Sequence, residues 1–311
     1  MAKSIRAGVA LASVLAFAPM CAPANAGGIS VTNSSDVAAL VNALLAGGTG
    51  GVHVTGYSLL NQSASTGETS TGLYTTNGPN NYNLPGSGIV LSTGNAADDG
   101  SGSYVPGHFP NTSYGLPADP AEMGLLQPLS PGTSRFFDAT QLTITFDVAA
   151  DTTSVNFGVV FASAEYPKYV GSYNDVFGLY LNGVNIAFAG GKPVNIDNPF
   201  MVNTGYDNYD GSPKGVDGSQ YQETPLLGLL VGPSGNPFMN FGGAVVAGSK
   251  GNTLTFIIAD AEDAAWDTAV YISGLGNAPP PGTVVPEPAS LTLLGLGLSA
   301  LALFSRRRAS K

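Results

Sequence analysis

Residues 141–162 read QLTITFDVAADTTSVNFGVVFA, and this stretch decides the fold class. Its first eight residues, QLTITFDV, alternate apolar and polar side chains, which predicts a strand with one buried face. Its last eight residues, VNFGVVFA (155–162), are almost continuously apolar, which is typical of a strand that is more fully buried. Both halves therefore indicate β structure.

Further strand signals lie on the C-terminal side of this stretch. Residues 176–189 read VFGLYLNGVNIAFA and predict a β-hairpin, because Asn182 and Gly183 tolerate the positive φ angles of a type I′ turn. LTFIIAD (254–260) and AVYISGL (269–275) predict two more strands, and the longest loop is expected at about 196–221. No repeat of 20–50 residues is visible, which argues against a propeller or solenoid. We predict an all-β fold, a single β-sandwich or jelly-roll-like domain over residues 27–276.

One short helix is expected near the start of this domain. Ser34 or Ser35 is suited to cap its N-terminus, and Gly47 and Gly48 to end it. The apolar residues between them have helical spacing and should lie against a sheet: Val37, Leu40, Val41, Leu44 and Leu45.

The charge of the chain excludes one class of function. Six of its 11 basic residues lie in the two terminal segments, and only Glu287 among its 21 acids lies there. The body therefore carries a net charge of about −15. A surface of this sign repels phosphate backbones, so no nucleic-acid partner is expected.

The N-terminal segment 1–26 is interpreted as a secretory signal peptide. It has Lys3 and Arg6, then an apolar run, then an A-x-A cleavage site ending at Ala26. Signal peptidase is therefore an expected partner. The single cysteine, Cys21, lies in the removed segment, so the mature domain is expected to fold without disulfides.

The C-terminal segment has three parts in a fixed order. A Pro-rich linker, 277–285, precedes Pro286, Glu287 and Pro288. An uncharged apolar run, 289–304, would span roughly 24 Å as a helix, short of the ~30 Å hydrocarbon core. A basic cluster then follows, made of Arg306, Arg307 and Arg308.

This order over 286–311 resembles a PEP-CTERM sorting signal. The resemblance implies recognition by an exosortase-type membrane protease and cleavage near Pro286-Glu287-Pro288. The hydrophobic helix would thus tether the chain to the inner membrane only transiently, much as a GPI signal is removed. The implied destination is the cell surface or extracellular matrix of an exopolysaccharide-producing Gram-negative bacterium.

A second resemblance covers most of the domain. Four stretches carry it: VHVTGYSLLNQSASTG (52–67), LPGSGIVLSTGNAAD (84–98), FASAEYPKYVGSYNDVFGLYLNGVNIAF (161–188) and IIADAEDAAWDTAVYI (257–272). Together they are similar to the choice-of-anchor L domain, a family of bacterial surface domains found with alternative C-terminal anchors. The family name describes attachment and implies no reaction.

Residues suited to nucleophilic catalysis or zinc binding are scarce. The only imidazoles are His53 and His108, which we interpret as a strand residue and a loop residue. GGAVVAGSK (242–250) is no P-loop, because Ser-Lys stands where Lys-Ser or Lys-Thr is required. We therefore expect no enzyme.

Carboxylates are the remaining candidates for a site. They follow two predicted strands, and calcium prefers six to eight such hard oxygen ligands. One hypothesis is a Ca²⁺ ion held by some of Glu165, Asp175, Asp260, Asp263 and Asp267. The alternative is that these residues are solvated loop acids and turn formers.

The sequence thus predicts an exported structural or adhesive protein. Its expected role is in exopolysaccharide, biofilm or floc organisation, with exopolysaccharide or other matrix proteins as partners. The alternative is a secreted carbohydrate-active enzyme, in which Glu165 works with Asp175 or Asp260 across roughly 5 to 10 Å. In that alternative nearby aromatic residues would stack on sugar rings: Tyr166, Tyr169, Tyr173 and Trp266.

Overall fold

The fold was analysed on a computed structural model that describes residues 28–48, 50–78, 80, 82–100, 110–166, 169–203, 230–231 and 238–279. The predicted signal peptide and sorting segment lie outside these residues, as do most of the linker and of the long loop expected at 196–221.

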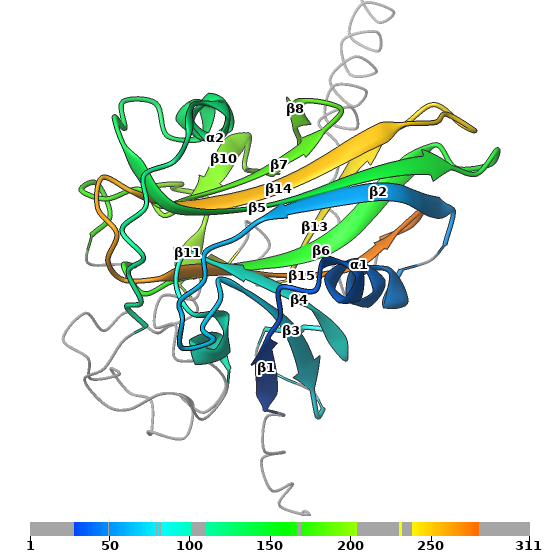
Figure 1. Cartoon of the computed structure of the whole chain (residues 1–311). Helices are drawn as coiled ribbons and strands as arrows, with labels where there is room; N and C mark the ends of the chain where they lie inside the picture. The colour runs from blue at the N-terminus through cyan, green and yellow to red at the C-terminus, as the bar shows by residue number, and fades with distance from the viewer. Residues whose placement is uncertain are drawn as a thin grey trace, which may run out of the picture.

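Two antiparallel sheets form the molecule, one above the other (Figure 1). The first has the order β1-β3-β4-β15-β6-β13, with bounds Ile29–Asn33, Thr71–Thr76, Ser87–Ser92, Thr268–Gly276, Ser154–Ser163 and Met239–Ala244. The second has the order β2-β5-β14-β7-β10-β9, with bounds Val52–Leu60, Phe136–Val148, Asn252–Ala261, Val176–Leu181, Lys192–Asn195 and Phe188–Ala189. β8 (Val184–Asn185) pairs with β7, and β11 (Val202–Asn203) pairs with β12 (Leu230–Val231) in a separate ribbon.

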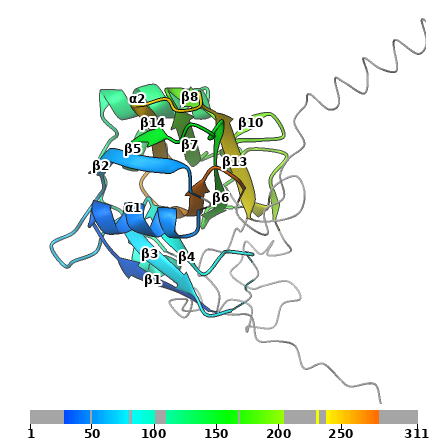
Figure 2. The same cartoon turned by 90° about the vertical axis from the view of Figure 1, so that its right-hand side faces the viewer.

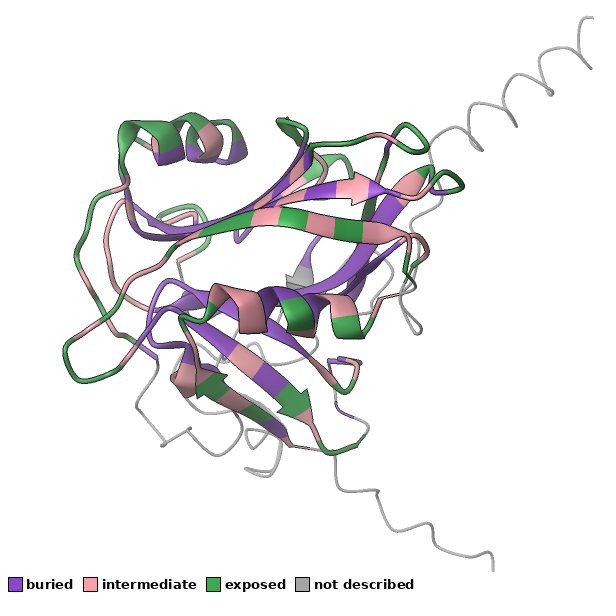
Figure 3. Cartoon of the chain, turned by 45° about the vertical axis from the view of Figure 1, so that its right-hand side comes forward, coloured by how far each residue is buried: buried purple, intermediate pink, exposed green. Residues whose placement is uncertain are grey.

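The core lies between the two sheets. Along β5, Leu142, Ile144 and Phe146 are buried, and the residues between them are partly exposed, as their alternation predicts. β6 is buried along nearly its whole length. Phe157 of β6 meets Phe256 of β14 across the layers, with ring centroids 5.6 Å apart. Figure 3 shows this buried interior between partly exposed outer elements, and the all-β sandwich is confirmed.

Helix α1 (Val37–Ala46) closes one side of the sandwich. It lies between the layer of β2 and the layer of β3 (Figure 2), with Leu40, Val41 and Leu44 in the core. The predicted serine cap is wrong. Asp36 caps the helix, because its Oδ1 accepts from the backbone N–H groups of Ala38 and Ala39 at 3.0 and 3.1 Å.

A second helix, α2 (Pro120–Leu126), was not predicted. It begins with a capping box between Asp119 and Glu122 and a proline at its first position. It continues into the 3₁₀ turn η2 (Gln127–Leu129) and covers the outer face of the second sheet. The expectation of a single packed helix is therefore incomplete.

The hairpin at 176–189 is confirmed at its turn and shortened in its second strand. Asn182 and Gly183 have φ angles of 50° and 81°. The side chain of Asn185 then accepts from the backbone N–H groups of Leu179 and Ala187, at 3.2 and 3.1 Å. Ile186 N–H still donates to the Leu179 carbonyl at 2.7 Å, but β8 ends after two residues and β9 pairs with β10 instead of β7.

No helix among the residues described is long and apolar enough to cross a membrane.

Candidate functional site

Three chain segments cross between the sheets at one end of the sandwich. The β6–β7 link (164–175) and the β14–β15 link (262–267) lie side by side, because Ala164 N–H donates to the Asp267 carbonyl at 3.0 Å. The long connection from β4 to β5 joins them, since Thr93 N–H donates to the Thr268 carbonyl at 2.9 Å. Most of the acids proposed from the sequence as calcium ligands lie on these segments, so the fold gathers them at this end.

Asp175 ties two of the crossings together. Its side chain accepts hydrogen bonds from the backbone N–H of Ala261, at 3.0 Å, and from the hydroxyl of Thr268. The residue is only 1% exposed. Burial raises the pKa of the Asp175 carboxyl to about 7, and these two hydrogen bonds limit the rise.

Glu165 lies near enough to Asp175 for the two carboxyl groups to influence each other electrostatically. It is 2% exposed, and its Oε2 has no hydrogen-bond partner among the described residues. Burial, and then the charge of Asp175, together raise the pKa of Glu165 to about 11. Because burial disfavours a charge on both carboxyl groups, the pair holds protons more tightly than exposed carboxyl groups do.

This burial also bears on the alternative of a glycosidase. The catalytic carboxyl groups of such an enzyme stand roughly 5 to 10 Å apart and must reach a bound sugar. Glu165 and Asp175 are instead only 2% and 1% exposed. As placed, neither carboxyl group is open to a bound sugar.

Asp260 completes a buried group of three. It follows the irregularity in β14 where the register with β5 shifts between Ile258 and Asp260. Burial, then the charge of Asp175, raise its pKa well above the ordinary value. Its Oδ1 lacks a hydrogen-bond partner within the described part of the chain.

Asp267 and Asp99 form a second buried pair beside the first group. Asp267 accepts from the backbone N–H of Thr112 through both oxygens, at 3.0 and 3.1 Å, and burial raises its pKa to about 7. Asp99 is fully buried, and burial followed by the charge of Asp267 raises its pKa well above the ordinary range. Gly94 makes room for Asp267, because a Cβ there would lie 1.8 Å from Asp267 Oδ2.

Asp138 is a further buried acid that the sequence analysis missed, as it missed Asp99. It lies in β5 with a φ of 47°, and it accepts from the backbone N–H groups of Tyr114, Gly115 and Leu116 at 2.8–3.1 Å. Together with Asp267 it fixes the segment 110–117 against the end of the sandwich. No local pattern marks either residue, because both depend on contacts between distant segments.

Asp263 lies apart from this buried set. It is partly exposed, and its Oδ1 accepts from the backbone N–H of Ala265 at 3.1 Å, as a turn former does. Of the five proposed ligands, the structure therefore buries four and leaves Asp263 at the surface.

The buried acids have no basic partner in the described residues. The one ion pair found there joins Arg135 Nε to Glu262 Oε2 at 3.6 Å, near the surface. Within the same residues, no group of three or more His, Cys, Asp or Glu side chains is arranged to hold a metal ion. Burial without a basic partner among these residues disfavours the charged form of each acid, which is why their pKa values are raised.

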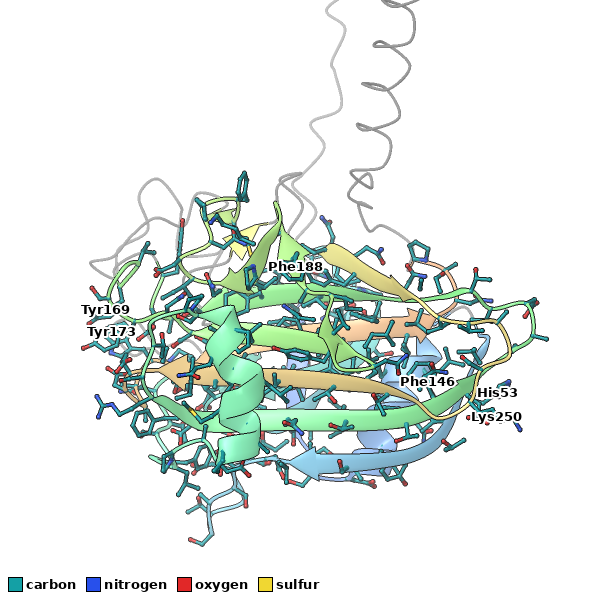
Figure 4. The ribbon with its side chains drawn as sticks, turned by 90° about the horizontal axis from the view of Figure 1, so that it is seen from above. His53, Phe146, Tyr169, Tyr173, Phe188 and Lys250 are labelled. Carbon is teal, nitrogen blue, oxygen red and sulfur yellow. The ribbon has the colours of Figure 1, made fainter. Side chains whose placement is uncertain are left out.

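Aromatic side chains from the same two links lie at the surface. The Tyr169 ring meets those of Tyr173 and Trp266 edge-on, with centroids 5.5 and 5.6 Å apart. All three are half-buried, and Figure 4 shows Tyr169 and Tyr173 together at one end of the molecule. Tyr166, which the sequence grouped with them, instead packs against the main core.

The structure describes His53 and the segment 242–250, two of the features that the sequence analysis interpreted as non-catalytic. His53 is an exposed residue of β2 at the end opposite Tyr169 and Tyr173 (Figure 4), and His108 lies outside the described residues. GGAVVAGSK (242–250) ends β13 and turns into β14 without a helix. It therefore lacks the strand–loop–helix setting of a phosphate-binding loop.

Two family models match the chain. One, described as the choice-of-anchor L domain, matches residues 29–276, and the other, the PEP-CTERM protein-sorting motif, matches residues 284–308. No curated protein and no solved structure matches the chain. The first match spans the whole sandwich and the second the tail beyond it.

Proposed function

The chain belongs to the choice-of-anchor L domain family, and on that premise we propose that it is a structural or adhesive protein of the extracellular matrix. Its role would be to organise exopolysaccharide, biofilm or flocs around a Gram-negative cell. The observation that carries this proposal is the PEP-CTERM motif at 284–308, which begins eight residues after the sandwich domain ends at 276. That motif marks an exported surface protein, anchored transiently in the membrane and processed by an exosortase.

Mass spectrometry of the protein from its native cells tests the sorting step. We expect a mature chain that ends near Pro286-Glu287-Pro288 and lacks Arg306–Arg308. Replacing both Pro286 and Pro288 with alanine should leave the tail attached, because it removes the motif that the protease recognises. Replacing Pro280 and Pro281 with alanine is the matched control, since these prolines lie in the linker outside the motif. A native protein that keeps its three arginines would contradict the proposal.

A binding role fits the arrangement of the acids better than a catalytic one. Glu165, Asp175 and Asp260 are each at most 2% exposed, and general acids or nucleophiles need direct contact with substrate. The surface above them is aromatic and partly exposed, which suits non-covalent contact.

Calcium binding by the acids remains a separate prediction. Glu165 Oε2 and Asp260 Oδ1 are buried oxygens without hydrogen-bond partners in the described chain, and an ion would satisfy them. An ion bound at 100 times its Kd would stabilise the fold by about 2.7 kcal/mol. We therefore expect saturating Ca²⁺ to raise the Tm above that measured in EGTA, and Glu165→Gln to reduce the difference. Equal Tm values in both buffers would rule out calcium at this site.

A further inference from the structure

The surface group formed by Tyr169, Tyr173 and Trp266, here called the aromatic rim, is held in place by hydrogen bonds of the two links that carry it. Tyr169 N–H donates to the Glu165 carbonyl at 3.0 Å, and Tyr173 N–H to the Tyr169 carbonyl at 3.1 Å. The second bond closes a turn in which Gly171 has a φ of 82°, and this turn returns Tyr173 to the side of Tyr169. Because Asp175 ties this link to the one that carries Trp266, the three rings keep a fixed arrangement.

The backbone at Trp266 shows that this arrangement is imposed by its surroundings. Its φ is 69°, a left-handed conformation that is strained for a bulky residue. The backbone N–H of Trp266 donates to Asn111 Oδ1 at 2.9 Å, which helps to hold it. Strained residues of this kind concentrate at binding sites, where the strain fixes a side chain in its working position.

The geometry of the rings indicates which ligand they fit. Edge-on contacts at 5.5 and 5.6 Å leave no space between the rings for a cation, so they do not form a cage. The three rings are instead partly exposed and lie together at the surface. Ring faces carry negative charge density and attract the weakly positive C–H groups on the flat side of a pyranose.

The charge near the rim restricts the ligand further. Asp263 is partly exposed on the Trp266 link, and its carboxylate is suited to accept from sugar hydroxyls. Polyuronates or sulfated chains would meet repulsion from this group and from the net negative body. A neutral polysaccharide carries no charge and meets no such repulsion.

We propose that the aromatic rim binds a neutral polysaccharide by stacking pyranose rings on Tyr169, Tyr173 and Trp266. The inference rests on the proposed matrix role and names the site and ligand class through which that role is exerted. No bond of the glycan is made or broken in this interaction.

Trp266 is the only tryptophan of the chain, so its fluorescence reports directly on the rim. The full-length protein is titrated with three neutral β-linked hexasaccharides: cellohexaose, laminarihexaose and mannohexaose. We expect a saturable change in Trp266 emission with at least one of them and none with an oligogalacturonate of equal length. Released reducing sugar, measured in the same samples, should stay at the level of the blank.

Variants separate stacking from general effects on the fold. Tyr169→Ala and Tyr173→Ala should each weaken binding roughly tenfold, whereas Tyr169→Phe should retain it, because the ring is kept. Tyr57→Ala is the matched control, since Tyr57 is 47% exposed on β2, outside the rim. Circular dichroism identifies any variant that fails to fold, and Tyr173→Ala then stands in for Tyr169→Ala.

Three results would overturn the inference: no emission change with any neutral probe, unchanged affinity in a folded alanine variant of the rim, or equal binding of the galacturonate. Reducing-sugar release that is lost in Glu165→Gln would replace binding with catalysis. If the protein is processed and held at the cell surface while the fluorescence does not respond, the rim inference fails and the proposed function stands. A protein with an uncut tail contradicts the proposed function whatever the rim binds.

Discussion

Replacing Asp175 with alanine is expected to lower the free energy of unfolding by about 3–5 kcal/mol, the usual effect of removing one member of a buried polar network. The change would leave the backbone N–H of Ala261 and the hydroxyl of Thr268 without their acceptor. Because these groups belong to two links between the sheets, the loss falls on the junction that holds the sandwich closed at this end.

Urea unfolding, followed by far-UV circular dichroism, measures this loss. Asp175→Asn retains an acceptor for the Ala261 N–H, so it should lower the free energy of unfolding by less, about 1–2 kcal/mol. Asp151→Ala is the matched control, because Asp151 is exposed in a turn and should change stability by no more than about 0.5 kcal/mol. If Asp175→Ala unfolds within about 1 kcal/mol of the unmodified protein, Asp175 is not the tie that its contacts indicate.

The strands that were predicted correctly are those whose side-chain period matches their burial. β5 alternates because one face meets the other sheet, and β6 is mostly apolar because it is buried along nearly its whole length. The hairpin turn was equally local, since Asn182 and Gly183 alone set its geometry. α2 was missed although its signal is also local: Asp119, Pro120 and Glu122 form a capping sequence that was available before the structure.

The site was only partly predictable, for a physical reason. The sequence places Glu165, Asp175, Asp260 and Asp267 after or before strands, and loop acids in such positions are ordinarily solvated. Their burial depends on three connections crossing between the sheets at the same end, which is a property of the topology. Asp99 and Asp138 depend on it as well, since each is buried by segments distant in sequence.

Stability is expected to fall as the pH rises from 5 to 8, because the folded state holds protons that the unfolded state releases. The pKa of Asp267 is about 7 when folded and 3.8 when exposed, so between these values the folded chain binds more protons. Such a group adds its full contribution to the free energy of unfolding below its unfolded pKa. That contribution is lost as the pH rises through 7. A shift of this size amounts to about 2–3 kcal/mol between pH 5 and 8 for one residue. The pKa of Asp175 is also about 7, so this residue likewise lowers the stability of the fold as the pH rises.

Urea unfolding at pH 5, 6, 7 and 8 in the presence of EGTA tests this, since EGTA leaves protons as the neutralising charge. Glu262, whose pKa is lowered by its contacts with Ser134 and Arg135, titrates below this range and does not mask the trend. Replacing Asp175 and Asp267 together with asparagine should flatten the pH dependence, because asparagine accepts hydrogen bonds and does not titrate. Stability that is constant or rises from pH 5 to 8 would show that the buried acids are already ionised in the fold, and an unseen cation would then have to balance them.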